Sequence, residues 1–193
     1  MESHQHSKRT VASPLPFADS ETPRGPLLVT APVALDTSAT PAAPVPGLEP
    51  AFEVAAALGP LEDHGSTRVG HRRVVPIAGG RVTGLIDAVI LPGGADWQVI
   101  RPDGTIEIDT RYSARTGAGE YVHFRTSGVR SGRPEILDAL LRGEPVDPSA
   151  YYFRVAVYLE TSAPRLAAVE RSIFVASAIR GADSVRYTAY RVT

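Results

Sequence analysis

After Gly47 the sequence consists of short β-rich runs that are separated by glycine-containing turns. This texture predicts strands rather than long helices, because turn residues interrupt every run before a helix could propagate. We predict strands at residues 50–58, 68–77, 81–91, 96–101, 104–115, 120–127, 151–160, 171–179 and 185–192. The predicted breaks are Gly79-Gly80, Pro92-Gly93-Gly94, Asp103-Gly104, Gly117-Ala118-Gly119 and Gly181. Many short strands with almost no helix favour an all-β barrel or sandwich over a parallel α/β sheet.

Two short segments predict a specific local structure, one a hairpin turn and the other a helix. Pro102-Asp103-Gly104 lies between two strand-like runs and predicts a hairpin, because glycine tolerates the positive φ that a tight turn needs. Residues 134–142 predict the one short helix, since Pro134 suits its first turn and Gly143 suits the position just past its end.

The chain divides near residue 48. Eight of its seventeen prolines lie within residues 1–46, and each fixes φ and removes a hydrogen-bond donor. We therefore predict an irregular, proline-rich N-terminal extension over residues 1–48 and a β-domain over 49–193. The extension is either a flexible or extended tail, or an apolar strap at 26–36 that lies on this domain or on a neighbour. His4 and His6 are not expected to bind a metal.

Composition excludes several classes of function. A net charge of −1 gives no electrostatic footprint for nucleic acid or an anionic membrane. The absence of cysteine removes disulfides, thiolate metal sites and cysteine nucleophiles. No apolar run is long enough for a secretory signal or a membrane span. No Walker loop, nucleotide-binding glycine motif or serine elbow is present. We expect a cytoplasmic protein without a metal, a cofactor, a nucleic-acid partner or a membrane.

Alternation along the strands separates an apolar face from a mixed one. In 104–115 the apolar face includes Ile108 and Tyr112, and the opposite face includes Asp109 and Arg111. A barrel can turn the mixed face toward solvent or toward a lumen that holds a ligand. The pattern alone leaves both arrangements open. The functional hypothesis below assumes that the mixed faces enclose a water-poor hollow.

The richest chemistry lies around Asp96 and Trp97, which follow Gly93-Gly94. A carboxyl group beside an apolar wall has a raised pKa and suits a general acid or base, while an indole can stack on a flat ligand. The alternative is a turn in which Asp96 caps the loop and Trp97 fills the core. Asp109 and Arg111 can pair on a surface or anchor a ligand in a lumen. Glu160 and Glu170 flank one connection, where acids serve as a catalytic pair or only as solvated loop residues.

Several motifs together resemble a known family. They are RVVPIAGG (73–80), LPGGADWQVIRPDG (91–104), IDTRY (108–112), EPVDPSAYYFR (144–154), LETSAP (159–164) and RSIFVAS (171–177). In this order they resemble the bacterial and fungal family known as domain of unknown function 3237, or UPF0311, over about residues 50–192. The resemblance implies a single antiparallel β-barrel that often forms a dimer. It also implies small-molecule metabolism, in some members within natural-product or aromatic-compound pathways.

One segment departs from that family. The usual pattern Tyr-x-Trp-Leu-Asn-Arg is replaced here by Leu166-Ala167-Ala168-Val169-Glu170-Arg171. If the family's Trp and Asn line its pocket, Ala168 and Glu170 would make the pocket of this chain roomier and more acidic.

These observations lead to one hypothesis and two alternatives. The hypothesis is a cofactor-independent acid/base enzyme, of the isomerase, cyclase or hydro-lyase type, that acts on a hydrophobic cyclic or polyketide-like small molecule in secondary metabolism. The alternatives are a carrier barrel that binds such a molecule without converting it, and a structural or assembly subunit. We expect a homodimer. The residues assigned to catalysis are Asp96, Glu170, Arg111 and Tyr112, and those assigned to ligand binding are Trp97, Asp109, Tyr152 and Glu160.

Overall fold

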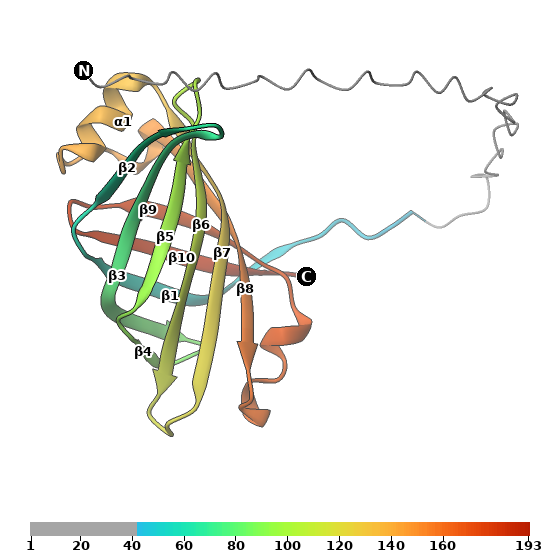
Figure 1. The fold of residues 1–193 in the computed structure, drawn as a ribbon. Helices are drawn as coiled ribbons and strands as arrows, with labels where there is room; N and C mark the ends of the chain where they lie inside the picture. Colours follow the sequence, from blue (N-terminus) through green and yellow to red (C-terminus); the bar gives the residue numbers. More distant parts are fainter. Residues whose placement is uncertain (1–41) are drawn as a thin grey trace, which may run out of the picture. The chain divides into compact units, whose positions relative to one another are not determined.

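Residues 42–193, which the computed structural model describes, fold mainly into β-strands, as the sequence predicts (Figure 1). The strands are β1 (Leu48–Leu58), β2 (Glu62–Thr67), β3 (Gly70–Gly84), β4 (Ala88–Ile90), β5 (Gly94–Ile100), β6 (Ile106–Thr116), β7 (Tyr121–Gly132), β8 (Tyr151–Thr161), β9 (Phe174–Arg180) and β10 (Ser184–Val192). The helices are α1 (Pro134–Leu141) and three 3₁₀ turns, η1 (Pro148–Ala150), η2 (Pro164–Leu166) and η3 (Val169–Arg171). The segment around His4 and His6 and the predicted strap at 26–36 lie outside the described residues.

The sheet closes on itself into an eight-stranded antiparallel barrel. Strand β1 pairs with β10 on one side and with β3 on the other, so neither side of the path β3-β6-β7-β8-β9-β10 is left as a free edge. The short strands β4 and β5 share one position in this circle, because both lie between β3 and β6. Strand β2 pairs only with β3 and flanks the barrel. Closure leaves one face of each barrel strand directed inward.

The predicted break at Gly79-Gly80 is wrong. Strand β3 runs through both glycines, and the chain leaves the strand only after Gly84. Gly80 has φ of 138°, and a Cβ atom there would lie 2.1 Å from the carbonyl oxygen of Ala55. The glycine is needed because the backbones of β1 and β3 approach each other closely, a role that a sequence pattern cannot separate from a turn.

The predicted hairpin turn and the predicted helix are confirmed, whereas one strand was not predicted and another is longer than predicted. The 102–104 turn joins β5 to β6, with Gly104 at φ 81° and Arg101 donating its amide to the carbonyl of Thr105 at 2.8 Å. Helix α1 begins at Pro134 and is followed by Gly143 at φ 76°. Strand β2 was not predicted, because its exposed polar sequence EDHGST lacks apolar alternation. Strand β7 extends five residues past its predicted end at 127, to Gly132.

The apolar faces of the strands point inward, and the mixed faces of β6 and β8 point outward. On β6 the buried side chains are Ile106, Ile108, Thr110, Tyr112 and Ala114, whereas Arg111 is exposed. The assumption that these mixed faces enclose the hollow is therefore wrong. Burial of the apolar set against the rest of the core outweighs any gain from enclosing charges, since an enclosed charge loses its hydration.

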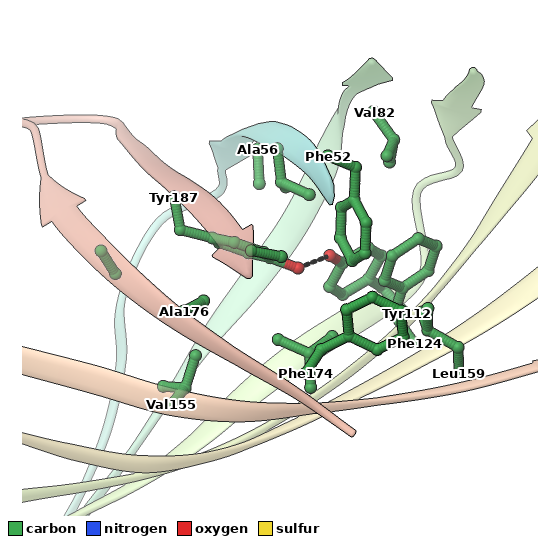
Figure 2. Packing of buried hydrophobic residues seen from close by; sticks show 14 of the residues in the cluster. Phe52, Ala56, Val82, Tyr112, Phe124, Val155, Leu159, Phe174, Ala176 and Tyr187 are labelled. Carbon is green, nitrogen blue, oxygen red and sulfur yellow. Dashed lines mark hydrogen bonds between the residues drawn. The ribbon is translucent and has the colours of Figure 1, made fainter. Parts of the chain in front are cut away.

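One end of the interior is filled by aromatic rings. Phe124 stacks on Tyr112 with ring centroids 4.8 Å apart, and Phe52 packs against both Phe124 and Phe174 (Figure 2). Beside this cluster the hydroxyl groups of Tyr112 and Tyr187 are 2.6 Å apart, and both tyrosines are buried (Figure 2). The hydrogen bond satisfies polar atoms that would otherwise be stranded in the core.

We predict that the two tyrosine hydroxyls stabilise the fold only as a pair. Tyr187→Phe should lower the free energy of unfolding by about 1–3 kcal/mol, because it leaves the Tyr112 hydroxyl buried without its partner. The double variant Tyr112→Phe/Tyr187→Phe should lose less than the sum of the two single variants. Urea unfolding of the four proteins measures this difference, and strictly additive losses would contradict the pairing.

Candidate functional site

The other end of the barrel interior holds a cavity of about 40 Å³ lined by both polar and apolar side chains. Its polar lining comes from β5, β6, β7, β9 and β10, and its members are Asp96, Gln98, Thr110, Tyr112, Thr126, Arg130, Arg180 and Tyr187. A second hollow of about 420 Å³ adjoins it and shares Leu58, Val75, Gln98, Arg130 and Arg180. Helix α1 contributes Leu140 and Leu141 to this outer hollow, which we call the mouth. Helix α1 lies at the end of the barrel where β7 stops (Figure 1).

Asp96 and Gln98 point into the cavity because they are two residues apart on β5. Both are buried, and Gln98 Nε2 donates to Asp96 Oδ2 at 2.6 Å. The other carboxylate oxygen, Asp96 Oδ1, is buried without a hydrogen-bond partner among the described residues. A carboxyl group with one free oxygen in a cavity can exchange a proton with a bound molecule.

Arg73 and Arg130 are the two buried cations of the site. Arg73 on β3 pairs in register with Gln98 and donates to Gln98 Oε1 from Nε at 3.1 Å and from Nη2 at 2.9 Å. Gln98 therefore connects Arg73 to Asp96 through hydrogen bonds. Arg130 near the end of β7 lies with its guanidinium 5.5 Å from the ring centroid of Phe153. Its Nε is buried and has no hydrogen-bond partner among the described residues.

Burial sets the protonation of these groups. It raises the pKa of Asp96 above its ordinary value of 3.8, although the Gln98 hydrogen bond, the nearby Thr110 hydroxyl and the charge of Arg130 oppose the change. Burial lowers the pKa of Arg130 to about 10, which still leaves it charged at neutral pH. Burial raises the pKa of Tyr112 well above 10 and raises that of Tyr187 too, so both phenols remain neutral.

Two of the eight predicted site residues, Asp96 and Tyr112, line the cavity. The other six lie on the outer surface. Trp97 is 39% exposed on the outer face of β5, and Arg111 pairs with Asp109 at 3.4 Å on the outer face of β6. They point outward because each is one residue out of phase with a buried neighbour on its strand. The remaining exposed members are Tyr152, Glu160 and Glu170.

The segment that departs from the resembled family also lies away from the cavity. Ala168 and Glu170 are exposed, and Glu170 Oε1 accepts a hydrogen bond from the amide of Thr161 at 2.9 Å. Thr161 ends β8, whereas the mouth lies near the start of that strand, where Tyr151 pairs with Gly132. The expectation that these two residues make the pocket roomier and more acidic is therefore wrong.

The sequence reasoning missed most of the polar lining. Arg130 follows the buried series Val122, Phe124 and Thr126 at even spacing along β7. This period of two would have predicted an inward-facing Arg130 if the predicted strand had not ended at 127. Arg73 gave no usable signal, because its neighbours Val74 and Val75 are both buried and the alternation is lost there.

Within residues 42–193, no group of three or more histidine, aspartate and glutamate side chains is arranged to hold a metal ion. In the same part of the chain, no helix has the length and apolar character required to cross a membrane.

Known proteins resemble this chain in sequence and in fold. A model of the family described as "Protein of unknown function (DUF3237)" matches residues 46–192. A UPF0311 protein of Bradyrhizobium diazoefficiens is 41% identical over 141 residues, which cover 73% of this chain and 93% of that protein. The crystal structure of a protein of unknown function from Rhodopseudomonas palustris is 37% identical with a TM-score of 0.74, covering 79% of this chain and 100% of the other.

A more distant structure shares the fold alone. It is described as an enzyme from Penicillium herquei, is 18% identical and has a TM-score of 0.59, covering 80% of this chain and 100% of that one.

We predict that Asp96→Asn raises stability in a pH-dependent way. Because the folded pKa of Asp96 is raised, ionisation costs more in the folded than in the unfolded chain. The native protein should therefore lose stability relative to the variant as pH rises from 3.8 through the raised pKa, and the difference should then level off. Urea unfolding of the native protein and of Asp96→Asn at a series of pH values across this range measures the difference in stability. A difference that is constant with pH would contradict the burial of an ionisable Asp96.

Proposed function

The chain belongs to the DUF3237 family, whose description assigns no activity, and from the chemistry of its interior we propose that it is a cofactor-independent acid/base enzyme. It transfers a proton on a hydrophobic small molecule, in an isomerisation, a cyclisation or the addition or elimination of water. Asp96 is the proton-transferring group. The observation that carries this proposal is the buried carboxyl group of Asp96, which lines the cavity and has one oxygen without a hydrogen-bond partner among the described residues.

The environment of Asp96 supports a catalytic role. A carboxyl group whose pKa is raised by burial is better matched to proton transfer near neutral pH than one in solvent. Burying a carboxylate also costs stability unless it is paired, and within residues 42–193 no arginine or histidine nitrogen lies within 4.0 Å of it. Groups that lower stability in this way are concentrated at functional sites.

Two kinds of donor are available for an oxygen that gains negative charge. Arg130 brings a buried positive charge, and its Nε has no hydrogen-bond partner within residues 42–193. In the Tyr112–Tyr187 pair one hydroxyl donates to the other, so the second hydroxyl hydrogen has no acceptor among the described residues. Donors fixed in a water-poor site stabilise an oxyanion more strongly than water does, because they are oriented before the reaction begins.

The volumes limit how a substrate enters. A cavity of about 40 Å³ has room for about three waters, so it admits only a small part of an organic molecule. The mouth of about 420 Å³ can take the remainder. The reacting carbon or oxygen would enter beside Asp96, and the body of the substrate would lie against Leu58, Leu140 and Leu141.

A carrier barrel is the second candidate. It is favoured by the absence, within the described lining, of another group that could exchange a proton near neutral pH, since the remaining titratable members are arginines and neutral tyrosines. A carrier would bind the same molecules and return them unchanged.

We predict that Asp96→Asn reduces turnover by about 100- to 10,000-fold, the usual contribution of a general acid or base. The assay uses cyclic enones and β-hydroxyketones in D₂O, with NMR detection of isomerisation, water elimination and deuterium incorporation at carbon. The matched control is Asp109→Asn, which changes a surface carboxylate on the neighbouring strand β6 and should leave turnover unchanged.

Three outcomes are informative. Loss of turnover in Asp96→Asn alone supports the enzyme. Equal turnover in Asp96→Asn and the native protein overturns the assignment of Asp96. Binding of these compounds by the native protein with no conversion and no deuterium incorporation overturns the enzyme in favour of the carrier.

A further inference from the structure

Three arginines from three different strands converge where the cavity meets the mouth. Arg73 lies on β3, Arg130 on β7 and Arg180 at the end of β9, and all three line the mouth. Arg73 is 4% exposed and Arg130 is 5% exposed. Their charges are close enough to lower one another's pKa, an effect that Arg73 and Arg180 both exert on Arg130. Keeping three like charges together in a partly buried site is costly unless something compensates them.

The described protein groups supply little compensation. Within residues 42–193, none of the three arginines has a carboxylate oxygen within 4.0 Å. Arg73 is satisfied by the neutral amide of Gln98, and Arg180 donates to the backbone carbonyls of Gly181 and Ser184 at 2.6 and 3.1 Å. Arg130 has a buried Nε with no hydrogen-bond partner in the described part of the chain.

The acidic groups around the cluster do not balance it. Among the described residues Asp96 is the one buried acid, and burial favours its neutral form. Asp63 and Asp183 act on Arg73 and Arg180 from a distance, but both are exposed, so solvent and salt screen them. The site therefore carries a net positive charge.

The rim around the cluster is apolar. Leu58, Leu61 and Leu140 line the mouth, and the guanidinium of Arg130 lies against the ring of Phe153. A ligand that suits this site needs a negative head for the arginines and an apolar body for the rim. A guanidinium can donate two parallel hydrogen bonds to the two oxygens of a planar carboxylate, whereas a lysine ammonium acts as a single point charge. Arginines therefore suit a carboxylate head.

We propose that Arg73, Arg130 and Arg180 form a binding site for the carboxylate of an organic acid with an apolar body, and that such an acid is the substrate class of this barrel. The first half of the proposal concerns binding and stands on the arginine cluster. The second half rests on the proposed function, because it assumes that the same interior carries out the chemistry at Asp96. The carboxylate occupies the boundary between cavity and mouth, with Gln98 connecting Arg73 to Asp96.

Benzoate tests the binding half with the full chain. It should bind saturably and raise the unfolding temperature, because a ligand that binds only the folded state stabilises it. Benzamide has the same shape without the charge and should bind at least tenfold more weakly. Inorganic phosphate is the third probe, because phosphate shares the negative charge but lacks the apolar body.

Variants identify the residues. Arg130→Gln should weaken benzoate binding by about 10- to 100-fold, the loss expected when a charged hydrogen bond is removed. Its matched control is Arg125→Gln, which changes an exposed arginine of the same strand β7 and should not alter benzoate binding. Arg180→Gln gives a second, less buried test, so the proposal remains testable if Arg130→Gln fails to fold.

Each outcome decides between alternatives. Equal binding of benzoate and benzamide overturns the anion site, as does equal weakening by Arg130→Gln and Arg125→Gln. Phosphate that binds more tightly than benzoate overturns the carboxylate assignment. Asp96→Asn separates the two proposals. When cyclic enones and β-hydroxyketones that carry a carboxylate are the substrates, the variant should keep benzoate binding while turnover is lost. Retained turnover in that variant, with benzoate binding still dependent on Arg130, overturns the catalytic role of Asp96 and leaves the anion site standing.

Discussion

The cost of taking charge out of water governs this barrel. Because β1 joins both β3 and β10, the sheet has an enclosed inner face, and each side chain on it is separated from bulk solvent. Most inward-facing positions are occupied by apolar or aromatic residues, which lose no charge hydration when they are buried. The buried charged residues gather at one end, where hydrogen bonds join Arg73 to Gln98 and Gln98 to Asp96, and where Arg130 lines the same cavity. The interior is therefore divided into an aromatic end and an end where a cavity is lined by charged side chains.

The sequence predicted the architecture better than the site. Turn glycines and period-two alternation were sufficient for the all-β class, the hairpin at 102–104 and helix α1, since these depend on local backbone preferences. They failed at Gly80, where glycine serves the close approach of β1 to β3 within a continuous strand. A residue whose role is set by a distant segment looks the same in sequence as a residue whose role is local.

The site was only partly predictable for a related reason. Asp96 and Tyr112 were identified from their chemistry, and both face the cavity. Trp97 and Arg111 were chosen by the same criterion, but each is one residue out of phase and points outward. The face of a strand that turns inward is decided by summed burial along the whole strand, so a conspicuous residue type does not reveal its own direction. Arg130 would have been found if the predicted strand had continued for three more residues, from 127 to 130.

The aromatic packing of Phe52, Phe124 and Phe174 has a consequence for how a ligand would enter and leave the barrel. These rings fill the interior at the end opposite the mouth, which lies on the side of α1. In the proposed enzyme, the substrate and the product would both pass through the mouth. Product that has not yet left the mouth would then exclude new substrate, so the two molecules would compete for the same space.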